Sequence, residues 1–233
     1  MGGGTEQLPR GRHGLTREYV TDHQRGRILN ATIACVAEHG YPDLTVEAIV
    51  GAARVSRRTF YHYFRNKEEA FLAAYDDVAR RLATRLRGIA ALRDATFAQR
   101  VEETLRTVLT FFAEHPAEAQ LTVVEALAAG PAALRRRHDA LLAIVDLVDR
   151  STHALTDGDD PRRLPPITAE TVVGGVVEVV YSRVERGETA RLPELLPDLA
   201  YCVLLPYLGP ATAAAEHDRL AGGDTPDGPR EGV

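Results

Sequence analysis

Arginine, tyrosine and histidine side chains crowd into residues 56–64, SRRTFYHYF. If this stretch is helical, Phe60 and Phe64 lie four residues apart and turn inward together. The outer faces then carry the hydrogen-bond donors Arg57, Arg58, Tyr61, His62 and Tyr63. An arginine fork can donate two hydrogen bonds to a guanine edge, and hydroxyl or imidazole groups can bind phosphates that set the register. The chemistry that this face favours is contact with double-stranded DNA.

Short helices with clear start signals would position this face. Thr45 can cap a helix that contains Ile49, and after a three-residue turn Ser56 can cap the next helix. Ile49 and Val55 are then inward partners of the two phenylalanines. This layout predicts a helix-turn-helix, whose second helix can enter a major groove.

Two further helices are predicted around this motif. A first helix runs from Val20 to His39 on helical apolar spacing, and Gly40 with Pro42 beyond it is a stop signal. Asn66, with Glu69 three residues later, resembles a capping box and predicts the start of a fourth helix.

At these residues the chain resembles the TetR family of bacterial regulators. The stretch VSRRTFYHYFRNKEE carries the resemblance, which is close over residues 27–72 and holds only in layout beyond them. Two positions depart from the common pattern: Val50 stands where a small alanine usually packs, and Arg54 stands where glycine usually makes the turn. A non-glycine residue in a left-handed turn costs about 1 kcal/mol, which tertiary packing can offset.

The resemblance implies roles for individual residues. Thr45 and Lys67 would bind phosphates on either side of the groove, and Arg57, Arg58 and Tyr61 would contact base edges. The full set expected to contact DNA is Thr45, Ser56, Arg57, Arg58, Thr59, Tyr61, His62, Tyr63 and Lys67. A solvated polar helix face is the alternative interpretation of these side chains.

The N-terminal arm, residues 1–20, has no hydrophobic period and is expected to be flexible. Arg10 and Arg12 flank a glycine after Pro9, which is similar to peptides that enter narrow minor grooves; a merely solubilising arm is the alternative. Residues 1–67 carry ten Lys or Arg against six Asp or Glu, and the remainder carries 18 against 27. A basic head therefore precedes an acidic body, although the net charge is −5.

Residues 68–208 continue as helices that are separated by glycine and proline breaks, and no strand is predicted. The expected spans are 67–92, 96–114, 117–129, 131–155, 167–187 and 193–208. The fold class is therefore all-α, with a DNA-binding domain of three helices over residues 21–67 and a helical domain for ligand binding and dimerisation over residues 68–208. Residues 209–233 are expected to form a disordered tail.

The last two predicted helices are apolar on more than one face, so both sides must be covered. In a TetR-like layout they pack against their copies in a second subunit, which makes a homodimer that reads a palindromic operator. The predicted contacts are Gly174, Gly175, Tyr201, Leu204, Leu205 and Tyr207. A purely monomeric core is the alternative.

The intervening helices are expected to enclose a small apolar effector that releases a repressor from DNA. The candidate ligand contacts are Phe111, Phe112, His115, Val124, Glu125, Ile144 and Glu178. Most such residues are simply core in other proteins, and a regulator without an effector, or an activator, is the alternative.

Several classes of protein are disfavoured. The eight histidines show no metal-ligand spacing, and neither a phosphate-binding glycine loop nor a G-x-S-x-G elbow is present, so we expect no enzyme and no cofactor. No apolar stretch approaches the roughly 20 residues of a membrane span, and a cytoplasmic location is expected. Cys35 and Cys202 are expected to be buried thiols.

Overall fold

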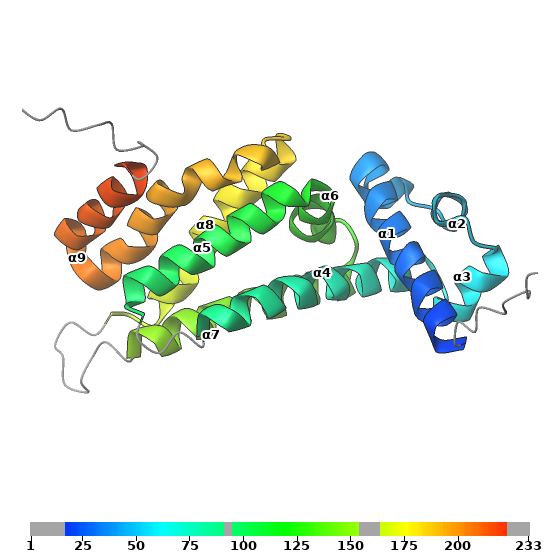
Figure 1. The fold of residues 1–233 in the computed structure, drawn as a ribbon, viewed down its shortest axis with the longest axis horizontal. Helices are drawn as coiled ribbons and strands as arrows, with labels where there is room; N and C mark the ends of the chain where they lie inside the picture. Colours follow the sequence, from blue (N-terminus) through cyan, green and yellow to red (C-terminus); the bar gives the residue numbers. More distant parts are fainter. Residues whose placement is uncertain (1–16, 91–94, 154–163, 223–233) are drawn as a thin grey trace, which may run out of the picture.

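The computed structural model describes residues 17–90, 95–153 and 164–222, and every regular element in those ranges is helical, as predicted. The molecule is elongated, with a head at one end and a body at the other (Figure 1). The head consists of α1 (Arg17–Asp43), α2 (Val46–Ala53) and α3 (Arg57–Tyr63). Residues 17–20 already belong to α1, so the predicted arm is shorter than 20 residues.

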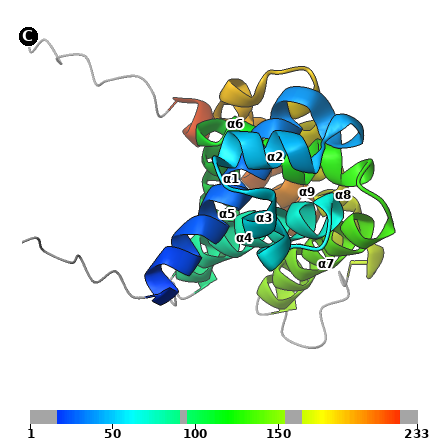
Figure 2. The ribbon, with the colours of Figure 1, turned by 90° about the vertical axis from the view of Figure 1, so that its right-hand side faces the viewer.

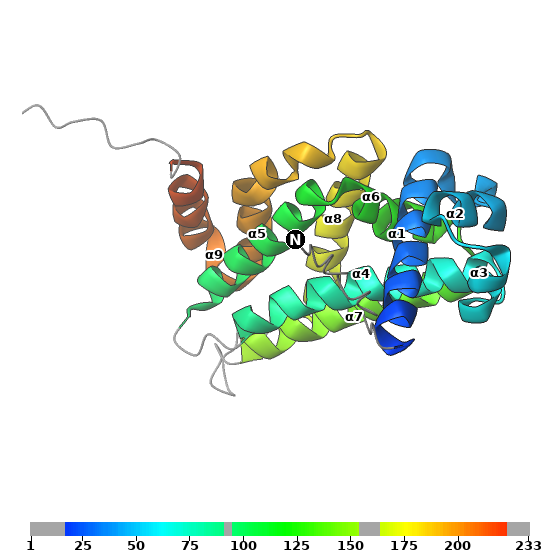
Figure 3. The same cartoon turned by 45° about the vertical axis from the view of Figure 1, so that its right-hand side comes forward.

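One long helix, α4 (Lys67–Ala90), leaves the head and runs along the body (Figure 3). The body also contains α5 (Phe97–Glu114), α6 (Pro116–Ala119), α7 (Pro131–His153), α8 (Ile167–Glu185) and α9 (Leu196–Gly222). None of the described helices is long and apolar enough to span a bilayer.

A single hydrophobic core continues from the head into the body. Its fully buried side chains include Ile28, Val36, Ile49, Phe60, Phe71, Phe111, Leu121, Leu192 and Leu204. Phe71 on α4 packs edge-on against Tyr41 at the end of α1, with ring centroids 5.0 Å apart. The head is therefore packed against the first turns of α4.

The glycine stop after His39 is confirmed, because Gly40 has φ 77° and ψ 163° and kinks α1. The uninterrupted helix predicted over 117–129 is wrong. After α6 the chain forms a π-helix over Gln120–Val124 and a 3₁₀ turn over Glu125–Leu127. No glycine or proline interrupts residues 117–129, so the sequence carries no local signal for this change.

The disordered tail predicted from Gly209 is also wrong for residues 209–222, which are helical. Gly209 has φ 79° and breaks the helix, but Pro210 then starts a new helical run, where its fixed φ and missing N–H are tolerated. Ala213 is fully buried, and Arg219 pairs with Glu102 of α5. This packing holds the final run against the body.

Candidate nucleic-acid interface

The turn between α2 and α3 is fixed by hydrogen bonds at both helix ends. The Thr45 hydroxyl accepts the Ala48 N–H at 3.1 Å and caps α2. Arg54 adopts the left-handed conformation expected for it, with φ 51°, and Val55 N–H donates to the Val50 carbonyl at 3.1 Å. Both departures from the common pattern are accommodated. Arg54 takes the left-handed conformation that the turn requires, and Val50 packs half-buried against the core.

Arg27 on α1 stabilises this turn from outside. Its guanidinium donates to the carbonyl oxygens of Ala53 at 2.5 Å and Arg54 at 3.0 Å. A hydrogen bond from a charged donor contributes about 1.5–3 kcal/mol, which exceeds the cost of about 1 kcal/mol for a left-handed arginine. Arg27 therefore offsets the absence of glycine at position 54.

The helix α3 is anchored on its inner side by Phe60, as predicted, and by Phe64, which follows its last residue in extended backbone. Phe60 is fully buried and Phe64 is 4% exposed, with ring centroids 5.8 Å apart. Ser56 caps the helix by accepting the Thr59 N–H at 3.0 Å, and the two hydroxyl oxygens lie 2.9 Å apart. Ser56 and Thr59 thus stabilise the start of α3. Their predicted contact with DNA stays a prediction.

Polar side chains cover the outer side of α3. Tyr61 is 54% exposed, and Arg57, Arg58 and His62 are also exposed. α2 and α3 stand in front of the body when the molecule is viewed from the head end (Figure 2). The structure therefore brings these four predicted residues together on one free end of the molecule.

Tyr63 lies differently from the other predicted contacts. It is half-buried, and its hydroxyl donates to Gln24 of α1 at 3.4 Å. Its ring packs edge-on against His62, with centroids 4.9 Å apart. Tyr63 therefore ties α3 to α1, and its phosphate contact stays a prediction.

Glu47 is a residue of this surface that sequence reasoning missed. It lies in the first turn of α2, and its carboxylate pairs with the guanidinium of Arg57 on α3. Both side chains remain more than half exposed. If α3 contacts DNA as predicted, a carboxylate beside it would repel phosphates, and the pairing with Arg57 would neutralise this unfavourable charge.

The Lys67 side chain binds backbone carbonyl groups at the end of α1 and just after it. Its ammonium donates to the carbonyl oxygens of Tyr41, Pro42 and Leu44 at 3.3, 3.1 and 2.8 Å. It also lies 4.9 Å from the centre of the Tyr41 ring. Because an ammonium has three N–H donors, these bonds occupy all of them, and its predicted phosphate contact requires that at least one be exchanged.

The start of α4 follows the predicted cap with one change. Asn66 Oδ1 accepts the Glu69 N–H at 2.8 Å, as a capping residue should. The Glu69 carboxylate bonds the backbone N–H of Arg65 at 2.7 Å instead of that of Asn66. This backbone hydrogen bond, together with the Arg65 guanidinium, lowers the pKa of Glu69.

The residues predicted for dimer contact fall into two groups. Gly174 and Gly175 are exposed on α8 with open space around them, and Leu205 on α9 is 36% exposed. Leu204 is 1% exposed within its own chain, so its predicted contact with a partner is wrong: the α9 helix turns it inward. Cys35 is buried as expected, whereas Cys202 lies exposed on the outer face of α9.

Tyr201 and Tyr207 of the predicted dimer set are half-buried. The Tyr201 ring packs against His217, with centroids 6.2 Å apart. Tyr207 packs edge-on against Phe97 at 5.3 Å, and its buried hydroxyl has no hydrogen-bond partner among the described residues. Burial raises the pKa of Tyr207. Both rings are therefore already engaged within one chain, and their contact with a partner stays a prediction.

The predicted ligand contacts do not all face one space. Phe111 and Phe112 are buried in the core, and His115 packs edge-on against Phe111. Val124 and Ile144 are half-buried. Glu178 lies exposed on α8, one turn after Gly174, so its predicted place inside the body is wrong.

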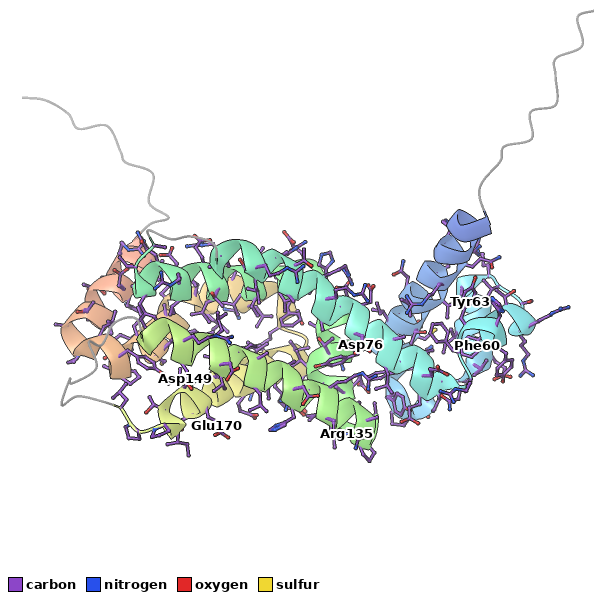
Figure 4. All side chains as sticks on the ribbon, turned by 90° about the horizontal axis from the view of Figure 1, so that it is seen from below. Phe60, Tyr63, Asp76, Arg135, Asp149 and Glu170 are labelled. Carbon is purple, nitrogen blue, oxygen red and sulfur yellow. The ribbon has the colours of Figure 1, made fainter. Side chains whose placement is uncertain are left out.

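An open groove of about 530 Å³ runs between the start of α4 and α7. It contains none of the predicted ligand contacts; its lining is Arg65, Asn66, Glu68, Glu69, Leu72, Ala73, Asp76 and Arg136. The side-chain view from below shows α4 and α7 side by side with Asp76 between them (Figure 4), and Asp76 pairs with Arg136 at 2.8 Å.

The predicted minor-groove contacts Arg10 and Arg12 lie outside the described residues.

Comparison with known proteins gives a consistent result. A family model described as bacterial regulatory proteins, tetR family, matches residues 28–74. The HTH-type transcriptional repressor Rv1474c of Mycobacterium tuberculosis is 31% identical over 165 residues, which cover 62% of this chain and 88% of that protein. The HTH-type transcriptional repressor AcnR of Corynebacterium diphtheriae is 27% identical, over 74% of this chain and 87% of that protein.

Solved structures share the fold at low identity. FadR of Bacillus halodurans, a fatty acid degradation regulator, superposes with a TM-score of 0.66 at 21% identity, covering 79% of this chain and 94% of that chain. FadR of Bacillus subtilis, solved in complex with stearoyl-CoA, gives 0.64 at 18% identity, covering 79% and 98%. The arrangement of head and body is therefore one that other regulators adopt.

Proposed function

Because this chain belongs to the TetR family of bacterial regulatory proteins, we propose that it is a homodimeric repressor that binds a palindromic operator. Each protomer inserts α3 into the major groove. One observation carries this proposal: Arg57, Arg58, Tyr61 and His62 lie exposed on one anchored helix at the free end of the head. A second copy doubles the number of base pairs that are read.

Within this surface, the two arginines and Tyr61 contact base edges. Arg58 is exposed on α3, and Arg57 is paired with Glu47 in the free protein. His62 and the Thr45 hydroxyl bind phosphates. Thr45 uses its oxygen to cap α2, which leaves its hydroxyl proton to donate.

The outer faces of α8 and α9 form the dimer contact. Val179 and Leu205 are 37% and 36% exposed, and Cys202 shares the outer face of α9 with Leu205. Gly174 and Gly175 lie open on α8, so a second helix can approach its backbone closely.

A small apolar effector lowers operator affinity by binding the body. α7 supports this view, because Leu141, Ile144 and Val148 are only half-buried and Leu142 is 46% exposed. A long-chain acyl thioester is the first compound class to test, since FadR of Bacillus subtilis was solved with stearoyl-CoA.

Gel-shift and footprinting assays on the DNA that flanks the gene test the proposal. We expect a protected palindrome for the wild-type chain. Arg57→Ala and Tyr61→Ala should each weaken binding by about 1–3 kcal/mol, or roughly 5- to 150-fold. Arg191→Ala is the matched control, because Arg191 is exposed on the body and, within the described ranges, its guanidinium pairs with the neighbouring Glu194. Absence of a protected site, or equal binding by all variants, contradicts the proposal.

A further inference from the structure

The chain leaves regular α-helix where the head meets the body. Residues 120–124 form a π-helix, and residues 125–127 form a 3₁₀ turn. Leu121 and Ala126 in this segment are fully buried, so its position is fixed by packing. The segment contacts α1 of the head on one side and α7 and α8 of the body on the other. The segment therefore joins α8 to the head by direct packing, and a displacement of α8 relative to the head would disturb these contacts.

Glu125 makes a direct polar bond from this segment to the head. Its Oε2 atom accepts the backbone N–H of Tyr41 at 2.8 Å, across 84 residues of sequence. Its Oε1 atom accepts the side-chain amide of Gln120 at 3.1 Å. Both carboxylate oxygens are therefore engaged, and the group is partly buried.

The kink at Gly40 makes this bond possible. With φ at 77°, Gly40 turns the backbone away from the helical path, which leaves the Tyr41 N–H free to donate outside the helix. A Cβ atom at position 40 would lie 3.5 Å from Glu125 Oε2. A side chain here would combine backbone strain with contact against the carboxylate.

Lys67 binds the same corner of the chain through the carbonyl groups that follow the Tyr41 N–H. Its ammonium accepts no hydrogen bonds and donates to the carbonyl of Tyr41 and to those of Pro42 and Leu44. Lys67 begins α4, which is the helix that joins head to body. The corner between α1 and α2 is thus held by a carboxylate of the body and by an ammonium of α4.

We propose that Glu125 is a positioning residue for operator binding: its bond to Tyr41 sets the orientation of the head on the body. This inference rests on the proposed function, because head orientation matters only when two linked heads must fit two half-sites. Glu125 touches no DNA. It acts by fixing α1, and through α1 the position of α3, relative to the α8 face that meets the second copy.

Operators with altered spacing separate this role from a merely structural one. Full-length Glu125→Ala is compared with wild type on palindromes whose half-sites are moved apart or together by one or two base pairs. We expect roughly tenfold weaker binding to the natural spacing, as for the loss of a charged hydrogen bond, and a flatter preference among spacings. The base preference within each half-site should not change, because α3 is intact.

Three further variants make the result decisive. Glu125→Gln keeps an oxygen that can accept the Tyr41 N–H, so it should restore most of the spacing preference. Glu125→Asp keeps the charge but is one methylene shorter, so it should resemble Glu125→Ala and serves if the alanine variant does not fold. Glu194→Ala removes a body carboxylate whose ion pair in the described part of the chain is with Arg191, and it should behave as wild type.

The possible failures are distinguishable. If folded Glu125→Ala or Glu125→Asp keeps the wild-type affinity and spacing preference, the role of Glu125 is wrong and the proposed function stands. If the wild-type chain binds no palindrome at any spacing, the proposed function itself is wrong. A variant that loses base preference and spacing preference together would also overturn the positioning role, because it would show damage to α3.

Discussion

The two ends of the molecule differ in how their exposed residues are supported. In the head, Tyr61 is 54% exposed, and the neighbouring Phe60 is fully buried and locks α3 from behind. In the body, α7 contributes Ala133 to the buried core but leaves Leu134 and Leu142 44% and 46% exposed. The head is thus complete within one chain, whereas the body presents apolar surface for which a second copy and an effector are the proposed occupants.

The largest expected effect breaks the head alone. Phe60→Ala removes a fully buried ring, which should destabilise the head by about 3–5 kcal/mol. We expect operator binding to be lost, while circular dichroism retains the helical signal of the body and sedimentation retains the dimer. Phe60→Leu, which fills most of the space, is the control. Complete unfolding of both regions would show that the head does not fold as a separate unit.

The next effect concerns the body surface. Gly174→Leu should leave the protomer as stable as wild type or more so, since helix propensity improves by up to about 1 kcal/mol. The added side chain blocks close approach of a second α8, so the dimer dissociation constant measured by sedimentation should rise about tenfold. Gly88→Leu on α4 is matched, because Gly88 is also exposed with open space around it. Equal dimerisation of both variants would place the contact elsewhere.

A smaller effect sharpens the description of the reading surface. Glu47→Gln removes the charge that pairs with Arg57, so on DNA that lacks the operator sequence the freed guanidinium should gain a phosphate contact. Affinity for unrelated DNA should rise, and the slope of log affinity against log salt should steepen by about one. Glu38→Gln removes the same charge elsewhere in the head. Identical salt slopes for the two variants would mean that the pairing has no role in binding.

The smallest effect lies at the end of α9. The His217 ring contacts Asp218 at 3.2 Å and Asp198 at 3.1 Å, and hydrogen bonds to these carboxylates raise the pKa of His217. A raised pKa in the folded state means that the stabilisation is complete below about pH 6.5 and is lost as pH rises through the folded-state pKa. NMR titration of His217 in the wild type and in Asp198→Asn should show a lower pKa in the variant. An unchanged pKa would exclude Asp198 as a cause.

Local signals in the sequence predicted most of the head. Thr45, Ser56 and Asn66 are caps where a capping residue precedes a helical apolar pattern, and Gly40 ends the straight part of α1. Each of these structures depends on residues within about four positions, so a short window of sequence contains its cause.

Contacts between distant elements were not predictable in the same way. Glu47 meets Arg57 only because α2 and α3 fold back on each other, and Glu125 meets Tyr41 across 84 residues. Glu178 and Leu204 were misplaced because helices that are apolar on several faces do not show which face turns inward. The Gly209–Pro210 pair predicts the end of a helix, although in the structure Pro210 starts another helical run.

A double-mutant cycle between protein and operator tests the reading role of α3 most directly. Every base pair of the protected site is replaced in turn, and binding is measured for the wild type and for Arg57→Ala and Arg58→Ala. We predict that replacing at least one base pair weakens binding of the wild type by about 1–3 kcal/mol. The same replacement should not weaken binding of one arginine variant, because that variant already lacks the contact. If every replacement costs wild type and variants the same, α3 does not read the operator through these arginines.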